Sequence, residues 1–283
     1  MKKFFKIIAY PAVICAALCA KYRKWLEISK TEIDTDIPVD LRLCVISDLH
    51  DYQYGKNNSV LLNSIKNAAP DYVCICGDLT NSYGNKTERA VKLVKDIVSM
   101  GITVIYVQGN HELNMERAYP SVKEKYIQRI KEAGAVLLDD ECFTAGNVNF
   151  IGYTNKLKQY KRIRGLYKLS YDELEEELDK KAGRMIKDGK YNIMLAHNPV
   201  YFKQYAAYGA DLVLSGHLHG GIIRLPIIGG IMSPQTFFGT RYSAGLYTEG
   251  KAKMYVSRGL GLHTIHLRLF NRPELAMIHI KKK

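Results

Sequence analysis

The first half of the chain alternates short, continuous apolar runs with segments whose apolar positions recur every three to four residues. The apolar runs at 41–47, 71–78 and 102–110 have the length and composition of buried strands. The segments 59–69 and 87–100 place their apolar side chains on one face, as amphipathic helices do, and Gly101 ends the second segment. This order of strand, helix, strand, helix and strand predicts βαβ units in a layered α/β fold.

The second half continues with shorter elements, and strands dominate its end. We expect a helix over 119–133, short antiparallel strands over 135–141 and 147–153, and a helix after Ser170, where Glu173 completes a capping box. Further strands are expected at 191–199 and 210–221, and the alternation after Lys253 predicts antiparallel strands. Because no linker interrupts 40–280, residues 41–283 are predicted to form a single domain, large enough to hold a catalytic site.

The N-terminal segment differs from the rest, because residues 7–20 form an uncharged apolar run between lysines. As a helix this run spans about 21 Å, and Phe4 and Phe5 extend it toward the roughly 30 Å of a bilayer core. We therefore interpret residues 1–24 as a single-pass membrane anchor or signal-like segment; a cleaved signal peptide and a buried soluble helix are the alternatives. Residues 25–40 are predicted to be a linker or an edge strand.

An anchor of this kind predicts a protein of the cell membrane. Basic residues flank the apolar run equally, three on each side, so the positive-inside rule does not decide the orientation. The extracytoplasmic side is favoured for the folded domain, because a single N-terminal anchor commonly exports the domain attached to it. We expect a monomer.

The formal net charge of +13 is concentrated at the two ends of the chain. Six basic residues lie in 1–24 and three more form the last triplet, which leaves about +4 for the folded body. Nucleic-acid binding is therefore not expected, and the remaining charge suits an anionic substrate or an anionic lipid. The basic stretch 155–169 has two interpretations, a solvated loop or a cap that meets anionic lipid.

Polar side chains follow five of the predicted strands, and each group contains residue types that ligate metals. The groups are Asp48-Leu49-His50, Gly77-Asp78, Gly109-Asn110-His111-Glu112, His197-Asn198 and Gly216-His217-Leu218-His219. In layered α/β folds, sites assemble at the carboxyl ends of strands. Oxygen and imidazole ligands without thiolate suit a divalent Zn, Mn or Fe ion. Each group alone is a weak signal, but five groups in this order predict a metal site.

These five motifs resemble the signature of the calcineurin-like metallophosphoesterase superfamily, which reads DxH, GD, GNH(D/E), a single His and GHxH. The resemblance covers about residues 41–280. GHLHGG at 216–221, SRGLG at 257–261 and LFNRPE at 269–274 look like a bacterial membrane-associated branch, the YkuE-like and YaeI-like phosphoesterases. The resemblance implies a four-layer fold, in which two mixed β-sheets pack as a sandwich flanked by helices.

The resemblance also implies seven metal ligands and two further catalytic residues. One divalent ion is expected to be held by Asp48, His50 and His219. The other is expected to be held by Asn110, His197 and His217. Asp78 would bridge the two ions. His111 would contact the phosphoryl or leaving-group oxygen as an acid or charge stabiliser, with Glu112 orienting it; considered as an isolated loop, His111 could instead be a further ligand.

The sequence thus predicts a dinuclear metal-dependent phosphoesterase. The bond hydrolysed would be a phosphomonoester, phosphodiester or pyrophosphate, attacked by a metal-bridging hydroxide, because two adjacent cations lower the pKa of a shared water. A lipid-linked or nucleotide-sugar substrate is expected, since the anchor places the site near a bilayer. The alternatives are a soluble nuclease or cyclic-nucleotide phosphodiesterase, and a non-catalytic binding scaffold on the same fold.

Overall fold

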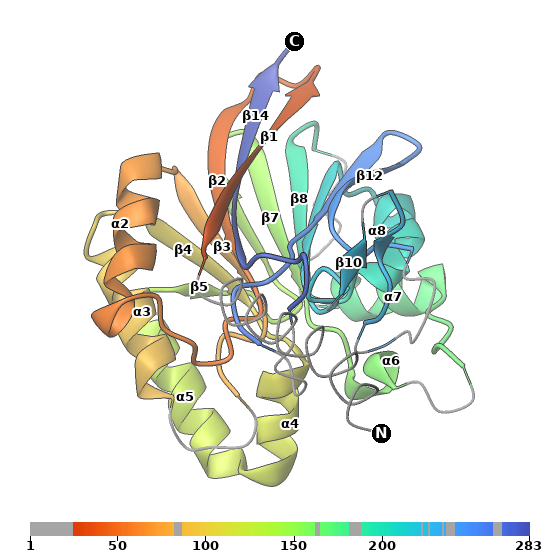
Figure 1. The fold of residues 1–283 in the computed structure, drawn as a ribbon. Coiled ribbons are helices and arrows are strands. Elements are labelled where there is room, and N and C mark those ends of the chain that lie inside the picture. The colour runs from red at the N-terminus through yellow and green to blue at the C-terminus, as the bar shows by residue number, and fades with distance from the viewer. Residues whose placement is uncertain are drawn as a thin grey trace, which may run out of the picture.

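Two six-stranded β-sheets form the centre of the molecule (Figure 1). The computed structural model describes residues 25–283 apart from 82–86, 162–164, 181–187, 222, 226, 234, 236–240 and 263–267. The first sheet has the order β1 (Glu27–Thr35), β14 (Glu274–Lys282), β2 (Asp40–Ile46), β3 (Tyr72–Cys76), β4 (Thr103–Val107) and β5 (Val136–Leu137). The second has the order β12 (Gly245–Glu249), β13 (Ala252–Val256), β9 (Leu212–Ser215), β8 (Tyr191–Ala196), β7 (Val148–Tyr153) and β6 (Cys142–Ala145).

Helices cover the outer face of each sheet (Figure 1). The first sheet is covered by α2 (Ser59–Ala68), α3 (Glu88–Val98) and α5 (Pro120–Glu132). The second sheet is covered by α7 (Tyr171–Asp179) and α8 (Phe202–Tyr208). Two further helices contact each other, α4 (Asn110–Ala118) and α6 (Leu157–Tyr160). The smaller elements are two 3-10 turns, Lys56–Asn58 and Pro199–Tyr201, and a hairpin of β10 (Arg224–Leu225) and β11 (Gly229–Gly230).

Three hydrophobic cores separate the four layers. In β2, Leu43 and Val45 point into the core between the two sheets, whereas Cys44 and Ile46 point into the core beneath the helices. Successive side chains of a strand face opposite sides, so a strand buried on both faces must be apolar throughout. This burial explains the continuous apolar runs in the sequence, and the predicted four-layer α/β fold is confirmed.

Parallel pairing brings the carboxyl ends of the central strands to one edge of the molecule. In the first sheet β2, β3 and β4 are parallel neighbours, with Ile46 opposite Ile75. In the second sheet β7, β8 and β9 are parallel neighbours, with Leu195 opposite Leu214. Because the sheets face each other, loops from both sheets meet at this edge, which we call the strand-end edge.

The antiparallel orientation predicted for the strand in 135–141 is wrong. The segments 135–141 and 147–153 are expected from the sequence to be antiparallel strands, which holds for 147–153 next to β6 but not for 135–141. Strand β5 pairs in parallel with β4, while β7 pairs antiparallel with β6, with Cys142 opposite Ile151. The chain therefore passes from the first sheet to the second between Leu137 and Cys142. Alternation along a strand reports which face is buried, but it does not identify the partner strand.

Residues 25–40 contain strand β1, which lies at the edge of the first sheet. It runs parallel to β14 from the C-terminus, with Glu27 opposite Glu274 and Thr35 opposite Lys282. None of the helices in the described part of the chain combines the length and apolar composition that a bilayer crossing needs. The segment 1–24, which we interpret as an anchor or signal-like segment, lies outside the described residues.

Candidate metal centre

All nine predicted site residues lie at the strand-end edge. From the first sheet come Asp48 and His50 after β2, Asp78 after β3, and Asn110, His111 and Glu112 at the start of α4. From the second sheet come His197 after β8, and His217 and His219 after β9. Eight of the nine are buried, which is unusual for so many titratable side chains in one place.

Five of these residues have a left-handed backbone conformation. Their φ angles lie between 49° and 70°, and they are Asp48, His50, Asp78, His217 and His219. This conformation costs roughly 1–2 kcal/mol for each non-glycine residue, so the surroundings must impose it. The backbone N–H of Asp48 donates to the Gly77 carbonyl at 3.1 Å, and that of His50 donates to the Asp78 carbonyl at 3.1 Å. Backbone strain at these five residues indicates that the directions of their side chains matter for function.

One cluster combines a carboxylate with two imidazoles. Asp48, His50 and His219 present ligand atoms that all lie within 4.8 Å of one another. The Nε2 atoms of His50 and His219 are 3.1 Å apart, and the two rings stack with centroids 5.1 Å apart. The Nε2 of His219 also lies 3.5 Å from Oδ1 of Asp48. Three nitrogen and oxygen donors that converge in this way fit a divalent cation.

A second cluster adjoins the first. The ligand atoms of Asp78, His197 and His217 also lie within 4.8 Å of one another. The Nε2 of His197 is 3.2 Å from Oδ2 of Asp78 and 3.8 Å from Oδ1 of Asp48, which joins the two clusters. The Oδ1 of Asn110 is buried and has no hydrogen-bond partner among the described residues. A buried acceptor without a donor is unfavourable, and a cation would satisfy it. The donor set therefore fits a pair of divalent ions.

His111 lies near the carboxylate of Asp78, which belongs to the second cluster. Its Nε2 is 4.0 Å from Oδ2 of Asp78, and its backbone N–H donates to Oδ1 of Asp78 at 2.8 Å. With His50 and Asp78 it forms a third group of ligand atoms within 4.8 Å. This position is compatible with both roles inferred from the sequence, proton donor and further ligand.

Glu112 anchors two loops through their backbones. Its buried carboxylate accepts hydrogen bonds from the N–H groups of Gly109 at 2.8 Å, Asp78 at 2.9 Å and Leu79 at 2.9 Å. The first of these groups follows β4 and the other two follow β3, so one side chain sets the spacing between the two strand ends. Glu112 therefore positions the strand ends that carry Asp78 and His111, so its effect on the direction of His111 acts at least partly through the backbone.

Burial and neighbouring charges shift the pKa values of the centre. Burial raises the pKa of Asp48 to about 6, although the positive charge of His197 opposes it. Burial acts on Asp78 in the same direction, but the charges of His197 and His111 outweigh it and lower the pKa of Asp78 well below its usual range. Burial favours the neutral ring of His197, yet the carboxylate of Asp78 raises the pKa of His197 to about 9. The carboxylates of Asp48 and Asp78 thus favour positively charged neighbours, and divalent ions would compete with protons for these sites.

Groups outside the five motifs orient the ligands. The Nδ1 of His197 lies 2.6 Å from the carbonyl oxygen of Cys76. Because a carbonyl only accepts, Nδ1 carries the proton, and Nε2 is left to face Asp78. The side-chain amide of Asn271 donates to the His219 carbonyl at 2.6 Å. Sequence reasoning did not find the Cys76 carbonyl, because it lies 121 residues from His197 and belongs to the backbone. Asn271 lies in the LFNRPE run, but nothing in that run indicates a contact with His219.

The SRGLG run at 257–261 closes over the first cluster. The backbone N–H of Gly261 donates to the Asp48 carbonyl at 2.6 Å. The guanidinium of Arg268, which is almost fully buried, donates to the carbonyls of Gly259 at 3.0 Å and Gly261 at 2.7 Å. Arg268 therefore holds this run against the metal centre, a role that nothing in the sequence indicates.

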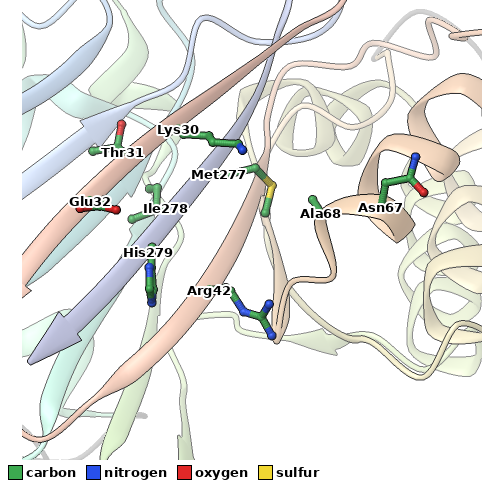
Figure 2. A pocket seen from close by; sticks show the side chains of 9 residues that line it. All are labelled: Lys30, Thr31, Glu32, Arg42, Asn67, Ala68, Met277, Ile278 and His279. Carbon is green, nitrogen blue, oxygen red and sulfur yellow. The ribbon is translucent and has the colours of Figure 1, made fainter.

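A surface pocket of about 310 Å³ lies away from the metal centre, between β1, β14, β2 and the end of α2 (Figure 2). Lys30, Arg42 and His279 line it, and Arg42 is the partner of His279 across the β2–β14 pair. None of the predicted metal ligands lines this pocket. We therefore place the candidate functional site at the metal centre.

The four-layer fold and its buried carboxylate–imidazole centre define the class of protein, a metal-dependent phosphoesterase and thus a hydrolase. Residues 41–221 match the model of the family described as calcineurin-like phosphoesterase. The chain belongs to this family, and the resemblance inferred from its five motifs is confirmed.

Three similar proteins come from bacteria. The metallophosphoesterase YkuE of Bacillus subtilis is 38% identical over 96 residues, which cover 34% of this chain and 33% of YkuE. The protein YpbG of Bacillus subtilis is 28% identical over 287 residues, which cover 98% of each chain. The phosphodiesterase YaeI of Escherichia coli is 39% identical over 88 residues, which cover 31% of this chain and 32% of YaeI. The matches to YkuE and YaeI thus span about a third of those proteins, and they confirm the predicted similarity to both.

Among solved structures, the chain is similar to a dimetal phosphatase from Danio rerio. The TM-score is 0.42 at 12% identity, and the match covers 78% of this chain and 88% of that structure.

Proposed function

We propose that this chain is a dinuclear metal-dependent phosphoesterase held at a membrane by residues 1–24. The observation that carries the proposal is the pair of adjoining clusters, Asp48–His50–His219 and Asp78–His197–His217. A binding scaffold that has lost catalysis has no need of a complete set of buried ligands. The intact set therefore favours an enzyme over a scaffold.

The ligand roles follow the two clusters. Asp48, His50 and His219 would hold one ion, and Asn110, His197 and His217 would hold the other, with Asp78 shared between them. When bound, the two ions would lower the pKa of a water molecule and neutralise phosphoryl oxygens. His111 would give a proton to the leaving-group oxygen. Its backbone hydrogen bond to Asp78 would fix its distance from the reacting phosphorus.

A phosphorylated lipid or nucleotide-sugar compound is the proposed substrate class, with a phosphodiester or pyrophosphate as the bond that is cleaved. The similarity to YaeI, a phosphodiesterase, supports ester cleavage. The apolar N-terminal run supports a substrate that resides in or at a bilayer. Mn, Zn and Fe all suit the nitrogen and oxygen donors. We further propose that the domain is monomeric and lies on the extracytoplasmic side.

The test separates proton donation from metal binding. We expect His111→Ala in the metal-loaded full-length protein to lower kcat by about 10²–10⁴-fold, the usual contribution of a positioned acid, while two ions remain bound. The decrease should be smaller for bis(p-nitrophenyl) phosphate than for an alkyl diester, because nitrophenolate leaves without a proton. Asp78→Asn should lose metal and activity together.

Metal analysis by mass spectrometry and turnover on both esters give the readouts. A His111→Ala protein that binds only one ion would show that His111 is a ligand. Wild-type protein that binds two ions per chain and hydrolyses neither ester would contradict the proposed function.

A further inference from the structure

The described chain begins at the strand-end edge. Strands β1 and β14 both start there, because β14 is antiparallel to β2, whose end carries the first metal cluster. The backbone N–H of Glu27 donates to the Pro273 carbonyl at 2.9 Å, and the Arg272 guanidinium lies 3.9 Å from the centre of the Trp25 ring. Asn271, the residue before Arg272, binds the His219 carbonyl. Residue 25, which directly follows the predicted anchor segment 1–24, is therefore held beside the metal centre.

Large apolar side chains are exposed at the same edge. The β10–β11 hairpin follows directly after His219, and near its turn Ile227 is fully exposed and Ile228 is 71% exposed. Leu225 in β10 and Phe270 are also exposed, and they lie on neighbouring segments because Ile223 forms a bridge with Leu269. We call Leu225, Ile227, Ile228 and Phe270 the apolar patch.

Single exposed apolar residues need no explanation, but adjoining ones on one hairpin and its neighbouring segment mark an interaction surface. Arg224 in β10 and Arg272, two residues after Phe270, bring positive charge beside the patch, whereas Arg258 is paired with Glu27 and Glu274. Exposed apolar side chains with arginines beside them match the acyl chains and anionic headgroups of a bilayer surface.

We propose that the apolar patch inserts into the phospholipid bilayer that anchors residues 1–24, so that the metal centre faces the membrane. The position of residue 25 fixes this orientation, because an anchor that ends there holds the strand-end edge against the lipid. The consequence for substrate, a phosphate presented from the bilayer, rests on the proposed function. The insertion of the patch rests on the membrane anchor in that proposal, but not on the phosphoesterase activity.

The single tryptophan of the chain makes the test direct. Full-length Trp25→Phe protein receives one new tryptophan, either Ile228→Trp in the patch or Lys251→Trp. Lys251 is exposed on the β12–β13 turn, at the opposite end of the second sheet. Both proteins are reconstituted in phosphatidylcholine–phosphatidylglycerol vesicles whose acyl chains are brominated close to the headgroups.

We expect bromine to quench the emission of Ile228→Trp and to leave that of Lys251→Trp unchanged, relative to vesicles without bromine. Equal emission losses in the two proteins, or no loss in either, would overturn the orientation. Turnover of bis(p-nitrophenyl) phosphate in the same samples separates the two proposals. Activity without quenching would overturn only the insertion of the patch, and quenching without activity would overturn only the proposed phosphoesterase activity.

A different observation concerns Tyr160, at the end of α6. Its ring packs against two predicted ligands, with centroids 4.9 Å from His217 and 5.9 Å from His197. The hydroxyl is buried, yet it has no hydrogen-bond partner in the described parts of the chain. A buried phenol beside a metal centre, with no partner among the described residues, is available to a ligand.

The backbone next to Tyr160 is held firmly. The carbonyl oxygen of Gln159 accepts three hydrogen bonds, from the Asn198 amide at 3.1 Å, the Tyr201 hydroxyl at 2.9 Å and the Gln235 amide at 2.8 Å. The side chain of Gln159 accepts from Asn155 at 2.9 Å. This buried network fixes α6 and thereby aims Tyr160, which is what a preorganised site requires.

We infer that the Tyr160 hydroxyl donates a hydrogen bond to a phosphoryl oxygen of the bound substrate. This role rests on the proposed function. We expect Tyr160→Phe to lower kcat/KM about tenfold, as the loss of one hydrogen bond of about 1.4 kcal/mol does, with metal content and thermal stability unchanged. Tyr205→Phe is the matched control, because its hydroxyl bonds Asn155 and Asn198 and its loss should lower stability.

Binding of inorganic phosphate to the Mn²⁺-loaded protein, followed by calorimetry, gives a readout independent of turnover. We expect the dissociation constant of phosphate to rise about tenfold in Tyr160→Phe. Equal phosphate affinity in wild type and variant would overturn the role of Tyr160, whether or not the ester is hydrolysed. A variant that loses metal or stability would show that Tyr160 serves the fold instead.

Discussion

Gly77 and Gly101 share one backbone torsion, φ +79°, in different surroundings. A Cβ atom on Gly77 would lie 2.6 Å from Nδ1 of His197 and 2.7 Å from Cα of Gly109. A Cβ atom on Gly101 would meet no atom within 4 Å. The two glycines therefore separate the cost of the torsion from the cost of crowding a metal ligand.

We expect Gly101→Ala to lower the free energy of unfolding by about 1 kcal/mol, from the torsion alone. Gly77→Ala should lower it by about 3 kcal/mol, since overpacking adds to the same torsion. Because the clash involves His197, only Gly77→Ala should also lose bound metal and phosphoesterase activity. Chemical denaturation and metal analysis provide the measurements, and equal effects of the two substitutions would contradict this account.

At the scale of elements, a buried ion network joins strands that are far apart in sequence. The Glu274 carboxylate at the start of β14 accepts from the Arg258 guanidinium at 3.0 Å, the Arg258 backbone N–H at 3.0 Å and the Tyr255 hydroxyl at 3.0 Å. Arg258 also pairs with Glu27 of β1 at 3.0 Å. Burial alone would raise the pKa of Glu274, but the charge and hydrogen bonds of Arg258 outweigh it and lower that pKa.

A lowered pKa gives stability that is present above the unfolded pKa, near 4.5, and is lost as the pH falls through the folded value. We expect Glu274→Gln to lower the free energy of unfolding by about 3 kcal/mol at neutral pH, because it leaves Arg258 half-paired in a buried position. The difference from wild type should shrink as the pH falls below 4.5.

Denaturation curves between neutral pH and the acid range measure this difference. Glu88→Gln is the control, because Glu88 pairs with Arg129 at 2.8 Å on the exposed surface, where ion pairs contribute little. A Glu274→Gln difference that stays constant through the acid range would mean that Glu274 does not titrate with folding.

At the scale of the whole molecule, the metal centre joins the two sheets. Its predicted ligands follow β2, β3 and β4 in the first sheet and β8 and β9 in the second, and the His217 N–H donates to the Asp48 carboxylate at 3.1 Å across the boundary. Ions that bind here would therefore stabilise the packing of one sheet on the other.

We expect Mn²⁺ at about 100 times its dissociation constant to stabilise the fold by about 2.7 kcal/mol and to raise Tm by roughly 5–10 °C. Asp78→Asn should remove most of this rise, because the shared carboxylate is lost. Differential scanning calorimetry with Mn²⁺ and with chelator measures it. A wild-type Tm that does not respond to either addition would argue that the centre binds no metal.

The sequence by itself determined the layered α/β class, the order of the ligand motifs and the residue types at each strand end. These features are local: buried strands need continuous apolar runs, and parallel strands leave their polar ends at one edge. For that reason all nine predicted site residues lie together. The assignment of individual roles within that group stays a prediction.

Only the tertiary structure decided which segments meet. Strand β1 joins β14, β5 and β7 enter different sheets, Cys76 orients His197, and Gln159 aims Tyr160 at the metal centre. Each of these contacts spans many residues or depends on the choice between two buried faces, and no local pattern encodes a partner. The position of residue 25 beside the metal centre is likewise decided by the tertiary structure, because it results from the pairing of the first described strand with the last.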